Sequence, residues 1–136
     1  MTFDFEWAYN IFKMKENLQL KTRVKIANPT DISKYEEVDV IIDTGATFSV
    51  IKRERLKRLG ISPIRKKKLK LANGDIIERD WGGACFIIEG KGEGVSDVIF
   101  AEENDTELLG LLSLEGMALS VDTKTGELKP IELFLL

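Results

Sequence analysis

Apolar and polar residues alternate along most of this chain, and this period predicts β-strands. In residues 18–28, four apolar residues are separated mainly by Gln, Lys and Arg, which is typical of a strand with one buried face. A turn signal at residues 28–31 precedes the apolar run 38–42, which predicts a second strand. Further strands are predicted at residues 84–89 and 95–102 around the loop 90–94, and at residues 118–122 and 127–136 around the turn 123–126. We therefore expect a mainly β domain.

Two short helices are predicted between the strands. Residues 52–59 contain strong helix formers with Leu56 and Leu59 on one face, and Gly60 is placed to end the helix. Residues 111–117 predict a second short helix.

A hairpin is predicted where Asn73 and Gly74 follow a Lys- and Leu-rich run, because both residues tolerate the positive φ of a two-residue turn. Residues 75–81 form its returning arm, and Gly82-Gly83 then predicts a bulge or a bend. Together with the two strands that follow, residues 69–102 are expected to form a β-meander.

The N-terminal residues 1–17 carry a different pattern. Apolar residues from Phe3 to Ile11 alternate with polar or small ones, which favours a strand, but Phe5, Ala8 and Phe12 also fall at helical spacing. We treat residues 1–17 as an extension, either a strand or a short helix, whose apolar face packs on its own core or on another subunit. Residues 18–136 form the main domain.

The composition removes several classes of function. The 136 residues include no histidine, so Ser-His and Cys-His nucleophilic pairs and most zinc sites are excluded. No glycine motif for phosphate or dinucleotide binding occurs. The single cysteine, Cys85, lies in an apolar run, which predicts a buried side chain. We expect no metal, no cofactor, no membrane-spanning segment and a cytoplasmic setting.

Charge is unevenly distributed, although the net charge is only −3. Residues 52–70 hold ten of the twenty basic residues, whereas residues 71–136 hold fourteen acidic residues and four basic ones. Nucleic-acid-binding surfaces show such asymmetry, but a solvated helix face followed by a Lys-rich edge strand accounts for it more simply. A nucleic-acid partner is therefore not expected.

An acidic residue, Asp43, stands directly after the apolar run 38–42 and before Thr44 and Gly45. Bringing a carboxylate to the end of a buried strand costs free energy unless the carboxylate is used or paired. In a chain without histidine, Asp43 is therefore the leading candidate for a functional group.

The sequence Asp43-Thr44-Gly45-Ala46, followed by Ser49-Val50-Ile51, resembles the active-site signature of the retroviral-type (retropepsin-like) aspartic proteases. The later order is similar too: a short helix, a flap hairpin, a second hairpin, an apolar-apolar-glycine element, a helix and a terminal strand. The resemblance covers residues 18–136 and is strongest to small single-lobe members found outside viruses. It implies a half-barrel fold, with the flap and substrate-binding residues Leu71, Ala72, Asn73 and Gly74, and with Leu109 and Gly110 in the structural second element.

The resemblance further implies an aspartic endopeptidase in which Asp43 is catalytic and Thr44, Gly45 and Ala46 support it. Peptide hydrolysis of this kind uses two carboxylates, one that takes a proton from water and one that polarises the carbonyl group. The chain supplies one signature. A two-fold symmetric homodimer, with Asp43 from each subunit, meets the requirement.

Two positions depart from the retroviral pattern. Thr47 and Leu111 stand where the retroviral enzymes carry an acid and an arginine that brace the dimer. The absence of both avoids an unpaired buried charge. The flap also contains fewer glycines than the viral form. An alternative function is therefore a catalytically weak or inactive dimer that binds extended peptides by β-augmentation.

Overall fold

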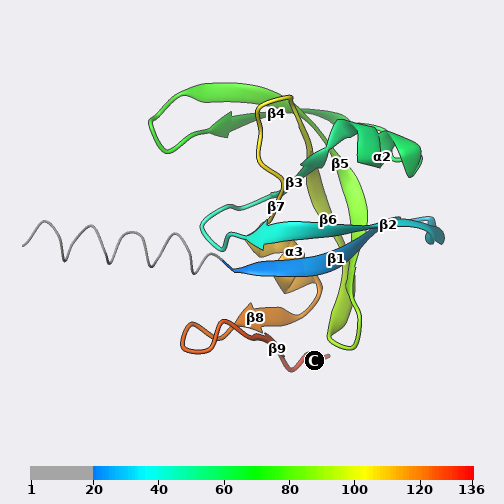
Figure 1. The fold of residues 1–136 in the computed structure, drawn as a ribbon, viewed down its shortest axis with the longest axis vertical. Helices are drawn as coiled ribbons and strands as arrows, with labels where there is room; N and C mark the ends of the chain where they lie inside the picture. Colours follow the sequence, from blue (N-terminus) through cyan, green and yellow to red (C-terminus); the bar gives the residue numbers. More distant parts are fainter. Residues whose placement is uncertain (1–19) are drawn as a thin grey trace, which may run out of the picture.

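The computed structural model describes residues 20–136, which form a mainly β fold with two short helices (Figure 1). The mainly β class predicted from the sequence is confirmed. The predicted N-terminal extension, residues 1–17, lies outside the described residues. In the described part, no helix is both long and apolar enough to cross a membrane.

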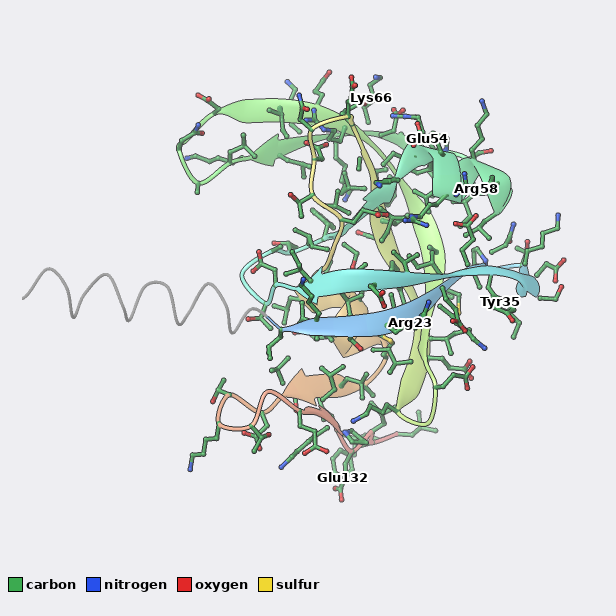
Figure 2. The ribbon with its side chains drawn as sticks, in the orientation of Figure 1. Arg23, Tyr35, Glu54, Arg58, Lys66 and Glu132 are labelled. Atoms are coloured by element: carbon green, nitrogen blue, oxygen red, sulfur yellow. The ribbon has the colours of Figure 1, made fainter. Side chains whose placement is uncertain are left out.

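The first two strands, β1 (Lys21–Asn28) and β2 (Asp31–Ile42), form an antiparallel hairpin. The predicted strand 38–42 is the buried end of β2, which begins earlier, at Asp31. Its first half is polar and mostly exposed, and it pairs with β1 along a ribbon that projects from the molecule on the side of Tyr35 (Figure 2). The apolar half of β2 enters the core.

The main sheet has seven strands in the order β1-β2-β7-β3-β6-β5-β4, and β1 also pairs with β5. Because β1 has partners on both edges, the sheet curls into a partly closed barrel. Two pairings, β2 with β7 and β3 with β6, are parallel. The strands after β2 are β3 (Ser49–Lys52), β4 (Arg65–Lys70), β5 (Ile76–Ile88), β6 (Gly92–Ala101) and β7 (Leu108–Leu109).

The β-meander predicted for residues 69–102 is confirmed for β4, β5 and β6, which pair consecutively and antiparallel. It does not describe the sheet as a whole. Turn signals indicate neighbours along the chain, whereas parallel pairs join strands that are separated by long connections. No pattern in the local sequence therefore predicts the parallel pairs β2–β7 and β3–β6.

Both predicted helices are present. Helix α2 (Arg53–Arg58) is followed by Gly60 at φ 75°, and its apolar face buries Leu56, with Leu59 just beyond its end. Helix α3 (Leu111–Gly116) packs against β6 and buries Leu114. The glycines of β6, Gly92 and Gly94, face the end of α3, where an added Cβ would collide with the carbonyl oxygens of Met117 and Gly116.

The flap hairpin joins β4 to β5, but the predicted two-residue turn is wrong. Leu71 N donates to Asp75 O (2.8 Å) and Gly74 N donates to Leu71 O (2.9 Å), which makes a three-residue loop with only Gly74 at positive φ (91°). Asn73 instead accepts a hydrogen bond from Asp75 N on its side-chain oxygen (2.9 Å). The Asn-Gly pair therefore forms a type I turn with a glycine bulge rather than a mirror-image turn.

Gly82-Gly83 does not form the predicted bulge. The two residues pair with Val98 and Asp97 of β6 without a change of register. Instead, β5 changes its other partner here, from β4 up to Trp81 to β1 from Cys85 onward. Figure 1 shows β5 bending from the flap hairpin at the top toward the bottom of the molecule. The predicted bend is therefore present.

The last strands are shorter than predicted. β8 (Leu119–Val121) and β9 (Leu128–Pro130) form a separate two-stranded sheet. The strand predicted to continue to residue 136 ends at Pro130, because residues 131–136 find no partner strand within the described chain. Leu133 and Phe134 are 80% and 78% exposed.

The core fills the inside of the curled sheet and is closed by α3 and β8. Cys85 is buried, as predicted, and burial raises the pKa of its thiol. The largest fully buried side chains are Phe86, Phe100, Ile26, Ile51, Leu56, Ile99, Leu109, Leu114 and Leu119.

Candidate active site

Asp43 lies at the end of β2, where the chain leaves the core and reaches solvent. Its backbone N–H donates to Leu109 O of β7 (3.0 Å), and its carbonyl accepts a hydrogen bond from Ala46 N (3.1 Å). One side-chain oxygen, Oδ1, accepts from Gly45 N (2.9 Å). The carboxylate is therefore oriented by its own loop while it stays accessible.

Gly45 and Ala46 contribute to this arrangement in different ways. A Cβ at residue 45 would lie 3.2 Å from Asp43 Oδ1, so a side chain there would crowd the carboxylate. Ala46 O accepts a hydrogen bond from Leu111 N (2.8 Å), and Thr47 O accepts one from Leu112 N (3.1 Å). These donors belong to the first turn of α3, whose N–H groups have no partner inside the helix. The helix start thus fixes the loop that carries Asp43.

The Leu109-Gly110 element crosses directly behind this loop. A Cβ on Gly110 would lie 2.5 Å from the carbonyl carbon and oxygen of Phe48 and 2.9 Å from Ser49 N. This separation is too short for any side chain, so the crossing requires glycine. The structure therefore places Leu109 and Gly110 against the Asp43 loop.

Three serines that the sequence analysis did not single out as functional join these segments. Ser49 Oγ accepts a hydrogen bond from Gly110 N (2.9 Å) and lies 2.5 Å from Ser113 Oγ, and Ser96 donates to Ser113 Oγ (2.8 Å). Ser49 and Ser113 are 0% and 1% exposed. This serine cluster (Ser49, Ser96, Ser113) links the Asp43 loop, α3 and β6. In the sequence, the one feature that could have indicated this cluster is the occurrence of each serine within an apolar run.

The predicted flap residues Leu71, Ala72, Asn73 and Gly74 form the exposed tip of the hairpin. The hydrogen bonds of the tip stay within the hairpin. The flap meets the Asp43 loop farther back, where Lys67 Nζ lies 4.8 Å from the centre of the Phe48 ring. The structure therefore brings the base of the flap, rather than its tip, to the loop.

A hollow of about 670 Å³ opens beside Thr44, the remaining residue of the predicted signature. Thr44 is exposed, and the hollow separates it from the β8–β9 turn. Figure 1 shows the flap tip, the loop after β2 and the β8–β9 turn projecting toward the same side. The hollow is mostly apolar and is lined by Leu20, Ile42, Thr44, Leu111, Leu114, Glu115, Leu119, Ser120, Val121, Thr123, Lys124, Thr125, Gly126 and Ile131.

Ion pairs anchor the base of the flap. Arg79 of β5 binds both carboxylate oxygens of Asp105 (2.7 and 3.0 Å), and Arg53 of α2 lies 2.8 Å from Asp80. Hydrogen bonding to Arg79 lowers the pKa of Asp105, and hydrogen bonding to Arg53 lowers the pKa of Asp80. Within residues 20–136, no three acidic, cysteine or histidine side chains gather as a metal site.

Comparison with protein families supports the resemblance drawn from the sequence. Residues 23–82, from β1 through the signature loop to the returning arm of the flap, match the model described as aspartyl protease. The match spans the Asp43-Thr44-Gly45-Ala46 signature and agrees with the resemblance drawn from it. The structure is also similar to EIAV protease complexed with the inhibitor HBY-793, with 20% identity, a TM-score of 0.48, and coverage of 85% of this chain and 92% of that chain. A search of curated proteins finds no match.

Proposed function

We propose that this retropepsin-like chain is an aspartic endopeptidase that acts as a homodimer, with Asp43 of each subunit facing a shared cleft. The observation that carries the proposal is the geometry of Asp43. Its carboxylate stays exposed at the end of a buried strand, while backbone hydrogen bonds from β7 and α3 hold the loop around it. A surface acid without function does not need such support.

The proposed reaction is hydrolysis of a peptide bond. Two carboxyl groups in contact share one proton, because two like charges at short distance repel each other. The ionised Asp43 takes a proton from water, and the water oxygen attacks the carbonyl carbon while the protonated Asp43 donates to the carbonyl oxygen. The C–N bond then breaks as a proton passes to the leaving amine.

Two surfaces support the dimer. The hollow beside Thr44 exposes apolar side chains next to the catalytic loop, and the apolar segment 131–136 extends into solvent without a partner strand in the described chain. Exposed apolar surfaces of this kind mark protein interfaces. The hollow lies beside the loop and is lined by Ile131, the first residue of the segment, so a contact that buries the hollow would bring the second carboxylate toward the first.

Asp43→Asn tests the proposal. We expect the substitution to remove cleavage of a peptide library, by at least about 10³-fold, because the neutral amide cannot take a proton from water. Folding should change little, since Gly45 N can still donate to the amide oxygen. Circular dichroism and sedimentation would check the fold and the subunit number.

The matched control is Asp39→Asn, which changes an exposed acid on the same strand whose side chain is 73% exposed. This variant should cleave at the wild-type rate. Retention of cleavage by Asp43→Asn would contradict the proposal. Binding of peptides without cleavage by the wild-type protein, over a wide pH range, would favour the peptide-binding module instead.

A further inference from the structure

The inner face of the flap carries one lysine whose position suggests a role in substrate choice. In the pairing of β4 with β5, Lys67 lies opposite Arg79 and Leu69 lies opposite Ile77. Paired residues of an antiparallel sheet share a face, and these four are partly buried, whereas Lys66, Lys68 and Lys70 are exposed. Figure 2 shows Lys66 on the upper edge of the molecule, away from the Asp43 loop.

Lys67 spans the space between the flap and the catalytic loop. Its Nζ lies 4.8 Å from the centre of the Phe48 ring and 4.5 Å from the centre of the Trp81 ring. Phe48 belongs to the loop that Asp43 begins, and Trp81 lies on the returning arm of the flap. Two cation–π contacts hold the ammonium group beside the Asp43 loop, where a flexible lysine would otherwise sample many positions.

The charges of the two inner basic residues are used differently. Arg79 donates from Nε and Nη2 to Asp105 and from Nη1 to Glu78 O, so all three of its nitrogens have acceptors. Lys67 forms only a long ion pair with Asp97 (3.8 Å), beyond hydrogen-bond distance, and the described residues provide no hydrogen-bond acceptor for its Nζ. An ammonium group has three donors, so those of Lys67 remain available.

We propose that Lys67 is a specificity-determining residue that selects substrates with an acidic side chain at the subsite between the flap and Phe48. A substrate carboxylate would approach Nζ more closely than Asp97 does and would form a charge-assisted hydrogen bond. Leu69 and Ile77 line the same face toward the tip and would contact the adjacent, apolar part of the peptide. This inference rests on the proposed peptidase function of the Asp43 cleft.

The test compares cleavage of one peptide library by the wild-type protein and by Lys67→Met, which keeps an unbranched apolar side chain over the two rings. We expect Asp and Glu to be enriched about tenfold at one subsite for the wild type, and this enrichment to be lost in Lys67→Met. Lys67→Glu should enrich Lys and Arg at the same subsite. Lys68→Met, which changes the exposed neighbour, should leave the preference unchanged.

The outcomes separate this inference from the proposed function. Cleavage by the wild type with no acidic preference, or with a preference that survives in Lys67→Met, would overturn the role of Lys67 and leave the peptidase intact. If the wild type cleaves no peptide, binding of the same library to the protein tests the preference directly. Equal binding of peptides that differ only by Asp or Asn would then overturn it.

Discussion

The loop that carries Asp43 and the flap that faces it are held in contrasting ways. The loop is fixed by backbone hydrogen bonds from β7 and α3, by the close crossing of Gly110 and by the buried serine cluster. The flap is anchored by ion pairs at its base, and its tip is exposed. The Asp43 loop is thus held by contacts with the core, whereas the flap is held by contacts at the surface.

This contrast implies a division of effects. Substitutions behind the loop should lower the stability of the whole domain, because the loop's contacts are core contacts. Substitutions in the flap should affect substrate handling more than stability, because few buried contacts are lost there.

The largest effect is expected for Gly110→Ala. The new Cβ would meet backbone atoms of Phe48 at 2.5 Å, and backbone cannot rotate away as a side chain can. We expect a loss of about 3 kcal/mol in the free energy of unfolding, at the upper end for overpacking. Urea denaturation would measure it. Gly83→Ala, where a Cβ meets nothing within 4 Å, is the control and should change stability by less than about 0.5 kcal/mol.

A smaller loss is expected for Ser49→Ala. The substitution leaves the buried N–H of Gly110 without its acceptor, which costs about 2 kcal/mol. Ser96→Ala removes the far end of the same cluster and leaves the Gly110 contact in place, so its cost should be smaller. If urea denaturation gives Ser96→Ala the larger loss, the cluster does not act by holding Gly110.

Asp105→Asn tests the anchor at the base of the flap. At neutral pH we expect a loss of about 1 kcal/mol, because Arg79 loses its charged partner. Arg79 lowers the pKa of Asp105, so this stabilisation is complete above the ordinary carboxyl pKa, about 3.9, and is lost as the pH falls through the lower value of the folded state. The difference between wild type and variant should therefore shrink below about pH 4. A constant difference from pH 7 to pH 3 would contradict this assignment.

The smallest change in stability is expected for Gly74→Ala at the flap tip. Residue 74 has φ 91° and open space around it, so the cost is backbone strain alone, about 1 kcal/mol. Gly90→Ala is a matched control, because Gly90 has φ 76°, equally open space and a place in a different hairpin. Similar stability but slower peptide cleavage in Gly74→Ala alone would assign the tip to substrate handling. Equal cleavage by both variants would remove that role.

Much of this site could be predicted from local sequence. The apolar run before Asp43 and the glycine after α2 each carry a short-range pattern, and the structure forms the end of β2 and the end of α2 there. The serine cluster joins residues 64 and 17 positions apart and had no such pattern. The flap turn was assigned wrongly because Asn73 can satisfy a neighbouring N–H with its side chain as well as adopt positive φ.

The parallel pairs of the sheet were also beyond local prediction. β7 is only two residues long and gains its place by inserting between β2 and β3. Its sequence gives no indication of either partner, because pairing depends on which edges the earlier strands leave open. The predicted strand 127–136 ends early, at Pro130, for the related reason that apolar content alone does not supply a neighbouring strand.

The long strand β5 gives the molecule a mechanical continuity that none of its shorter elements provides. Its first half is one arm of the flap, and its second half is paired on both sides within the barrel. At Gly82-Gly83 it has left β4 and not yet reached β1, so β6 is its one partner strand there. One continuous strand therefore connects the flap to the barrel. We expect a displacement of the flap tip to be transmitted along β5, through Gly82-Gly83, into the core.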